Sequence, residues 1–88
     1  MKIKEGFILR EVAGSYVVVA VGEASKSFKG VIKLNNSGAI LWKELEKGVS
    51  TLDSLTKALL NEYNIDEETA KKDVSAFLDQ LMKAKIVE

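Results

Sequence analysis

The chain has 88 residues, 47% of them hydrophobic, with 13 basic and 13 acidic side chains and no Cys, His or Pro. That length supports one core, so we expect a single domain over residues 1–88, and the missing thiols and imidazoles argue against a metal, a cofactor or a disulfide. The balanced charge argues against binding to nucleic acid, and the charged start, followed by no long apolar run, argues against a membrane segment and favours the cytoplasm.

Three short apolar runs in the first half of the chain predict β-strands. Runs 7–12 and 16–21 flank Ala13-Gly14-Ser15, where Gly14 supplies the positive φ of a hairpin turn. The second run is apolar at every position, as in a central strand that is covered on both faces or lies close to a partner. A polar loop is expected over 22–27. The expected strands are 6–13, 15–21 and 30–34.

The apolar spacing then changes from two residues to about 3.6, which predicts helices. Asn35 or Asn36 is the expected N-cap of the first helix, Ser50 with Asp53 has the capping-box form ahead of the second, and Asp66 is the expected N-cap of the third. The expected helices are 36–47, 51–63 and 66–84. Their expected buried stripes are Ile40, Leu41, Trp42 and Leu45; Leu52, Leu55, Leu59 and Tyr63; and Ala70, Val74, Phe77, Leu78 and Leu81.

Strands that precede helices in this way predict an α+β domain, a three-stranded antiparallel meander with three helices on one side. If strand pairing follows the chain order, strand 15–21 is central and strands 6–13 and 30–34 are edges. An uncovered edge offers unpaired backbone N–H and C=O groups to another chain. We therefore expect the third strand to be either protected or used for binding.

The charged residues show no catalytic pattern, and no catalytic residue is predicted. The candidate carboxylate pairs, such as Glu44 with Glu46, lie on predicted helices among lysines, where solvated surface charge is the ordinary interpretation. Trp42 falls in an apolar cluster and is expected in the core, with stacking on a ligand as the alternative. Helices 51–63 and 66–84 are spaced like a helix-turn-helix, but the last helix lacks the basic stripe of a DNA-reading helix.

Two stretches of the chain resemble a known family. Residues 7–19, with Arg10-Glu11-Val12-Ala13-Gly14 at the turn, and residues 34–42, with the pattern Leu-Asn-x-x-Gly-Ala-x-x-Trp, are similar to the coenzyme PQQ synthesis protein D family. The similarity covers nearly the whole chain and includes residues 73–81 of the last helix. Many relatives have a proline near the position of Ala20, and this chain departs from the pattern there.

The resemblance implies a winged-helix-like domain that recognises ribosomally made precursor peptides. In such domains the leader segment of the precursor is added as a strand beside the third strand, in a groove closed by the third helix. The implied partner is a modifying enzyme, most often a radical S-adenosylmethionine enzyme, and the implied function is non-catalytic capture and delivery of the leader. The implied peptide-binding residues are Val31, Ile32, Lys33 and Leu34 on the strand and Lys71, Val74, Ser75 and Leu78 on the helix.

Other interpretations stay open. A winged-helix domain is also a common nucleic-acid-binding fold, and DNA is the alternative partner. The edge at 30–34 also suits pairing with a second copy of the chain, which would give a homodimer. On the helix, Val74 and Leu78 equally fit a structural role in the core.

Overall fold

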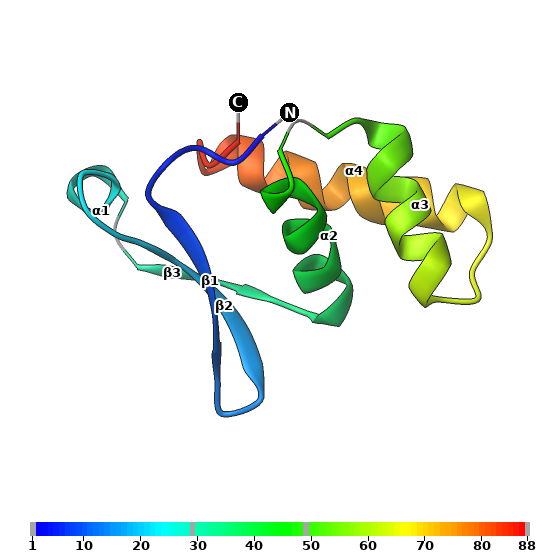
Figure 1. Ribbon diagram of the computed structural model, residues 1–88, viewed down its shortest axis with the longest axis horizontal. Helices are drawn as coiled ribbons and strands as arrows, with labels where there is room; N and C mark the ends of the chain where they lie inside the picture. The colour runs from blue at the N-terminus through cyan, green and yellow to red at the C-terminus, as the bar shows by residue number, and fades with distance from the viewer. Residues whose placement is uncertain (1, 29, 49, 88) are drawn as a thin grey trace.

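In the computed structural model, which describes residues 2–28, 30–48 and 50–87, the sheet lies on one side of the molecule and the three longer helices on the other (Figure 1). The elements are β1 (Phe7–Val12), β2 (Ser15–Ala20), α1 (Ala24–Ser27), β3 (Val31–Leu34), α2 (Asn36–Glu46), α3 (Leu52–Glu62) and α4 (Glu67–Lys83). The sheet is antiparallel in the order β1-β2-β3, which confirms the predicted α+β fold with a central second strand.

A two-residue turn, Ala13-Gly14, joins β1 and β2. The φ angles of these residues are 51° and 80°, and Val12 lies directly opposite Ser15. Positive φ at both turn residues is typical of type I′ hairpins, whose twist matches that of the flanking strands. Gly14 takes this conformation at no steric cost, whereas Ala13 adopts it despite its Cβ.

The segment 22–27, expected to be a polar loop, contains the single helical turn α1, so that prediction was wrong for four of its residues. The Ser25 hydroxyl donates to the Gly22 carbonyl at 2.6 Å, and Lys26 Nζ donates to Glu23 Oε1 at 3.2 Å. One turn is too short to produce a helical repeat in the sequence, which is why the apolar spacing gave no signal there.

Helices α2 and α4 begin at the side chains expected to cap them. Asn35 Oδ1 accepts the Gly38 N–H at 2.8 Å, and Asp66 Oδ1 accepts the Thr69 N–H at 2.7 Å. Each bond satisfies a backbone donor that has no partner within its helix.

The cap of α3 differs from the predicted one. Thr51 and Ser54 cap each other, since the Ser54 N–H donates to Thr51 Oγ1 at 3.1 Å and the Thr51 N–H donates to Ser54 Oγ at 3.0 Å. The expected box of Ser50 with Asp53 was wrong, because Ser50 is buried and its hydroxyl donates to the Glu44 carbonyl at 3.3 Å.

The core lies between one face of the sheet and the three longer helices. Trp42 is fully buried there, which confirms the core interpretation of this residue. In α3 the outer ends of the predicted stripe were wrong: Leu52 is 41% and Tyr63 is 36% exposed, because they flank the middle of the helix that packs against α2 and α4. The buried apolar residues are Val18, Leu34, Ala39, Leu41, Trp42, Leu45, Leu55, Leu59, Ala70, Val74, Phe77, Leu78, Leu81, Ile86 and Val87.

Among the described residues, the three longer helices leave the other face of the sheet uncovered. Val18 on β2 points into the core and is fully buried, whereas its neighbours Val17 and Val19 point away and are half-buried. Coverage of this strand on both faces, one of the two expectations for its apolar run, is therefore wrong.

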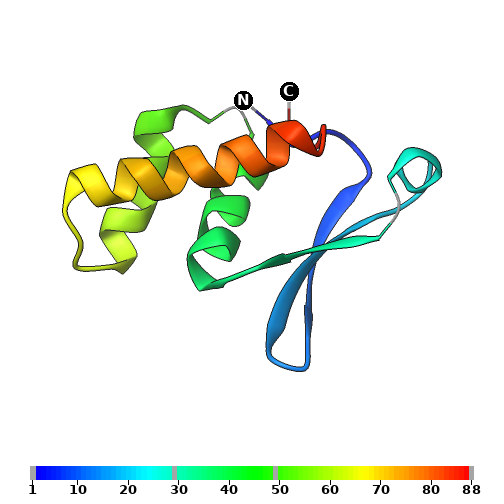
Figure 2. The ribbon, with the colours of Figure 1, turned by 180° about the vertical axis from the view of Figure 1, so that it is seen from behind.

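The segments before β1 and after α4 lie side by side and close the domain (Figures 1 and 2). Ile3 and Val87 form an antiparallel bridge, and the Lys4 N–H donates to the Ile86 carbonyl at 2.7 Å. Because Ile86 is fully buried, this contact ties the end of α4 to the start of the sheet.

Candidate functional site

The hydrogen-bonding alternation in the sheet decides which backbone groups are free. In an antiparallel ladder, residues in hydrogen-bonded pairs alternate with residues whose N–H and C=O groups point the other way. The Val21 N–H donates to the Gly6 carbonyl at 2.7 Å, which sets this alternation for β1 and β2. Along β2, the odd-numbered residues 15, 17 and 19 therefore bond to β1, and the even-numbered residues bond to β3.

The same alternation leaves part of β3 unpaired. Two pairs use the backbone groups of β2 that face β3, and they are Tyr16 with Leu34 and Val18 with Ile32. The N–H and C=O groups of Val31 and Lys33 consequently point outward from the sheet. No other described residue donates to these groups or accepts from them. The edge thus offers four backbone groups to an incoming strand, and the strand order confirms the expectation that β3 is an edge.

The side chains of β3 alternate between the two faces of the sheet. Leu34 is 8% exposed and Ile32 packs against the core, so both side chains lie on the helical face. Val31 is 56% exposed and Lys33 is exposed, and both lie on the open face.

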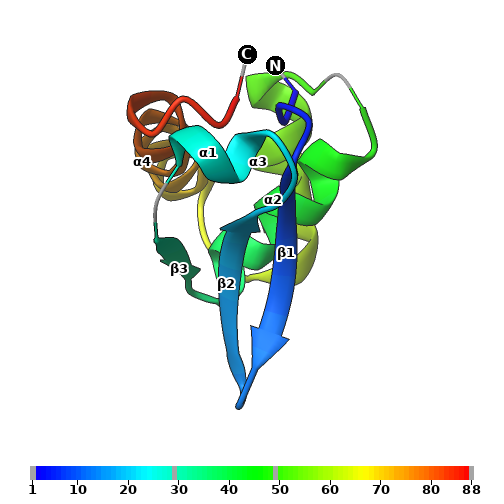
Figure 3. The same ribbon diagram turned by 90° about the vertical axis from the view of Figure 1, so that its left-hand side faces the viewer.

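A pocket of about 280 Å³ lies between β3 and α4. In both Figure 2 and Figure 3, β3 lies below α4. The volume is just below the roughly 300–1,000 Å³ of most small-molecule sites, so it suits one or two side chains of a longer ligand. Its lining residues are Lys33, Leu34, Asn35, Ser37, Gly38, Leu41, Asp73, Ala76, Phe77 and Gln80.

The structure brings only some of the sequence-predicted residues to this pocket. Lys33 and Leu34 line it, and Val31 and Ile32 belong to the strand beside it. The helix residues named from the resemblance do not line it. They are Lys71, Val74, Ser75 and Leu78.

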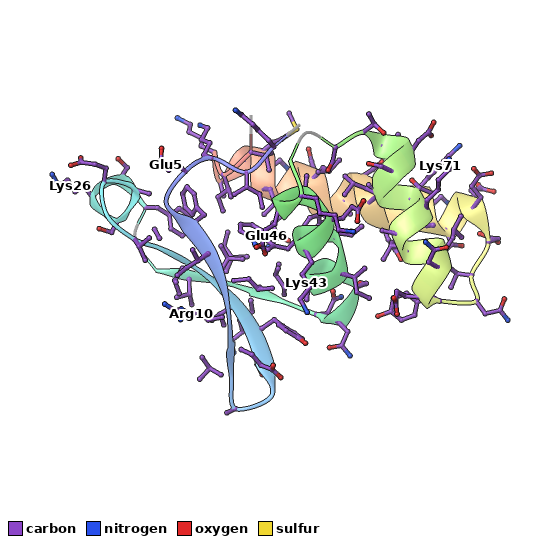
Figure 4. All side chains as sticks on the ribbon, in the orientation of Figure 1. Glu5, Arg10, Lys26, Lys43, Glu46 and Lys71 are labelled. Carbon is purple, nitrogen blue, oxygen red and sulfur yellow. The ribbon has the colours of Figure 1, made fainter. Side chains whose placement is uncertain are left out.

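The helix residues lie elsewhere for a geometric reason. Val74 and Leu78 are 0% and 6% exposed and belong to the core. At 3.6 residues per turn, Lys71 and Ser75 lie roughly opposite the face of α4 that lines the pocket. Lys71 Nζ lies 3.9 Å from Glu67 Oε1, at the end of the molecule away from α1 (Figure 4).

Sequence reasoning missed eight lining residues of the pocket. On α4, the missed residues Asp73, Ala76, Phe77 and Gln80 follow the i, i+3, i+4, i+7 spacing of a helix face. The helical spacing that could have identified them is present in the sequence. This face of α4 borders the buried stripe on one flank, and the face of Lys71 and Ser75 borders it on the other. Sequence alone does not say which flank faces the sheet. The other missed residues are Asn35, Ser37, Gly38 and Leu41.

A second hollow, of about 520 Å³, is larger but lies away from the free edge. Residues from the segment before β1, from α1 and from the end of α4 line it. Phe7 and Phe28 meet there edge to face, with ring centroids 5.4 Å apart. Of the described residues of the sheet, only Phe7, at the start of the other edge strand β1, reaches this hollow. The pocket beside β3 instead lies next to the end of an edge strand and a long helix, so we place the candidate site at β3.

The described ranges also limit the available chemistry. Within residues 2–28, 30–48 and 50–87, no three metal-ligating side chains of His, Cys, Asp or Glu form a group, and no helix is both long and apolar enough to cross a membrane. Two of the residues that line the pocket are charged: Lys33 on β3 and Asp73 on α4.

Together, the fold and this edge define a small α+β domain with an open strand beside a groove, the geometry that suits pairing with an extended chain. The sequence profile of the family described as coenzyme PQQ synthesis protein D matches residues 7–87. The chain therefore belongs to this family, as the Leu-Asn-x-x-Gly-Ala-x-x-Trp pattern indicated. No curated protein matches the chain in a sequence comparison.

Two solved structures share the fold. One, described as TbiB1 in complex with the TbiA(beta) leader peptide, matches with a TM-score of 0.78 and 23% identity over 100% of this chain and 95% of that one. The other, described as lasso peptide synthetase B1 complexed with the leader peptide, matches with a TM-score of 0.73 and 17% identity over 99% of this chain and 95% of that one.

Proposed function

We propose that this protein captures the leader segment of a ribosomally made precursor peptide by adding it as a fourth strand beside β3. The observation that favours this function most is the free edge formed by Val31 and Lys33, which runs along the pocket between β3 and α4. Family membership and the leader peptides named for the two related structures support the same function.

The energetics require both the edge and the pocket. Four backbone hydrogen bonds contribute about 4 kcal/mol at roughly 1 kcal/mol each. A micromolar complex needs about 8 kcal/mol, and ordering the peptide costs more. Burial of peptide side chains against Leu34, Leu41 and Phe77 therefore supplies the remainder in this proposal. The backbone bonds give affinity for any extended chain, and the pocket gives selectivity.

The bound peptide is held for another protein to modify, and this protein takes no part in the chemistry. The proposed partner is a modifying enzyme, a radical S-adenosylmethionine enzyme being the type most often found with this family, and the proposed compartment is the cytoplasm. Holding the leader raises the effective concentration of the attached core peptide at the active site of that enzyme.

A second copy of the chain is the competing occupant of the edge. Lysine on an edge strand disfavours edge-to-edge pairing, and Lys33 is such a lysine. We expect the protein without peptide to be a monomer of 9.7 kDa, and measured mass against concentration tests this. A homodimer that dissociates when peptide is added would instead show that the peptide and a second copy of the chain compete for the same edge.

A pair of tryptophan variants tests the proposed groove. Ala76 and Ser75 are adjacent and exposed on α4, but only Ala76 lines the pocket. In Ala76→Trp the indole fills the pocket, and we expect the affinity for peptide to fall by about tenfold, equivalent to about 1.4 kcal/mol. The probe is a fluorescent leader peptide from the precursor gene nearest the gene for this chain, measured by anisotropy.

Ser75→Trp and Lys71→Glu are the matched controls, since both change exposed positions outside the pocket. Each should leave the affinity within about twofold of the original. Circular dichroism and thermal melting show whether every variant is folded. Loss of binding in the two controls, with Ala76→Trp unaffected, would move the site to the other flank of α4.

A further inference from the structure

We infer that Lys33 selects an acidic residue placed between two apolar residues of the bound peptide. This inference rests on the proposed function and adds which peptide sequences the edge accepts. It follows from the alternation of backbone groups and side chains in β3 and from the charge on the open face of the sheet.

The inward-facing positions of an added strand lie next to apolar residues of β3. A peptide residue directly across from Leu34 or Ile32 has its side chain on the same face as they do, which is the helical face. Beside Leu34 this face opens into the pocket, where Leu41 and Phe77 contribute apolar surface and Asn35, Asp73 and Gln80 contribute polar groups. Because Leu34 and Ile32, its two cross-strand neighbours on this face, are both apolar, we expect the peptide to present two apolar side chains, two positions apart.

The peptide residue between those two lies across from Lys33. Its side chain points to the open face, and directly opposed residues on neighbouring strands have Cβ atoms only about 5 Å apart. This geometry holds whether the added strand runs parallel or antiparallel to β3. The Lys33 side chain is exposed, so it is free to meet a peptide side chain there.

The open face around Lys33 is basic. Val17 pairs with Lys33 on one side and with Arg10 on the other, so the two cations share one cross-strand row. No described residue forms an ion pair with either of them. The face includes no carboxylate among its strand residues, which are Ile8, Arg10, Val12, Ser15, Val17, Val19, Val31 and Lys33.

This charge distribution decides which residue fits opposite Lys33. An aspartate or glutamate there places opposite charges across the pair, whereas a lysine or arginine adds a third cation to the row. Opposite-charge cross-strand pairs stabilise a sheet and like-charge pairs destabilise it. The expected preference for an acidic over a neutral residue is about threefold in affinity, and a basic residue should bind more weakly than a neutral one.

Selection from a random library tests this pattern without knowledge of the natural leader. Phage displaying random 12-residue peptides are selected on the wild-type protein, on Lys33→Glu and on Lys57→Glu. Lys57 is exposed on α3 and lines no pocket described above, so its variant makes the same charge change away from the edge. Wild type and Lys57→Glu should select apolar-acidic-apolar sequences, and Lys33→Glu should select apolar-basic-apolar sequences.

Backbone methylation of the selected peptides separates the two possible failures. In an added strand only alternate N–H groups face β3. Of two peptides, one N-methylated at its odd positions and one at its even positions, one should therefore lose binding and the other should keep it. Peptides that show this alternation but no acidic preference, or no reversal with Lys33→Glu, overturn the role of Lys33 and leave strand addition standing. If no selected peptide shows the alternation, both the proposed function and this inference fail.

Discussion

Gly38, in the first turn of α2, lies directly against Leu34 at the end of β3. A Cβ on Gly38 would be 3.3 Å from Leu34 Cβ and 3.2 Å from Asn35 Oδ1. The Leu-Asn-x-x-Gly part of the family pattern is therefore a structural joint: Leu34 anchors the strand in the core, Asn35 caps the helix, and Gly38 leaves room for both. All three residues also line the pocket.

Replacement of Gly38 by alanine tests this joint. Alanine in a helix is normally favoured over glycine by about 1 kcal/mol. At Gly38 the new methyl group is crowded by Leu34, and overpacking of this kind costs about 1–3 kcal/mol. We expect urea denaturation to show Gly38→Ala less stable by about 1 kcal/mol, while Asn36→Ala, at an exposed neighbour, changes stability by less than about 0.5 kcal/mol. If Gly38→Ala is instead more stable than the original protein, the packing around Gly38 has room for a methyl group.

The hairpin turn predicts two opposite effects at adjacent residues. Ala13 holds a φ of 51°, a conformation in which asparagine is tolerated better than alanine, so Ala13→Asn should stabilise the protein by about 0.5–1 kcal/mol. Gly14 has a φ of 80°, and Gly14→Ala should cost about 1 kcal/mol. Thermal melting of both variants measures the effects. Equal effects of the same sign would contradict a type I′ turn.

Proline and alanine variants of Ile32 and of Lys33 test which backbone N–H groups of β3 are free. The Ile32 N–H faces β2, so Ile32→Pro should be at least about 2 kcal/mol less stable than Ile32→Ala. The Lys33 N–H faces outward, so Lys33→Pro and Lys33→Ala should differ by less than about 1 kcal/mol. Comparison with alanine at each position removes the contribution of the side chain. A reversed order would place Ile32, rather than Lys33, on the free edge.

The cap of α4 predicts a loss of stability in acid. The Thr69 side chain and then the Thr69 N–H lower the pKa of Asp66 below its ordinary value. A carboxyl group whose pKa is depressed in the folded state contributes stability that is complete above its unfolded value of about 3.9 and is lost as the pH falls through the folded value. Unfolding measured from pH 6 down to pH 2 should show this loss, and Asp66→Asn should remove its share.

A carboxyl NMR titration provides the direct check on Asp66. Its midpoint should lie below that of an unstructured aspartate. A midpoint at or above that value would contradict the bond to Thr69, whatever the unfolding curves show.

Much of the fold was predictable because its signals are local. The two-residue alternation, the change to a 3.6-residue spacing, and the caps at Asn35 and Asp66 depend only on neighbouring residues. The cap of α3 was missed because Ser50 bonds to Glu44, six residues earlier and in the preceding helix. The local sequence pattern does not show which of several hydroxyl groups forms a hydrogen bond to a carbonyl group farther away in the chain.

The candidate site was predictable on the strand and not on the helix. The strands were expected to pair in chain order, so β3 was identifiable as an edge. The rotation of α4 about its axis depends on how it packs against α2, α3 and the sheet, and two flanks of its apolar stripe satisfied the same spacing. The structure turns the flank of Asp73 and Phe77 toward β3 and leaves Lys71 and Ser75 on the other side.

An NMR titration of ¹⁵N-labelled protein with the leader peptide of the nearest precursor gene tests the central claim most directly. We expect the largest amide shift changes at Val31–Leu34 and along Asp73, Ala76, Phe77 and Gln80, together with slowed amide exchange at Val31 and Lys33. Shift changes confined to α2 and α3, with Val31 and Lys33 still exchanging as in the free protein, would contradict strand addition at β3.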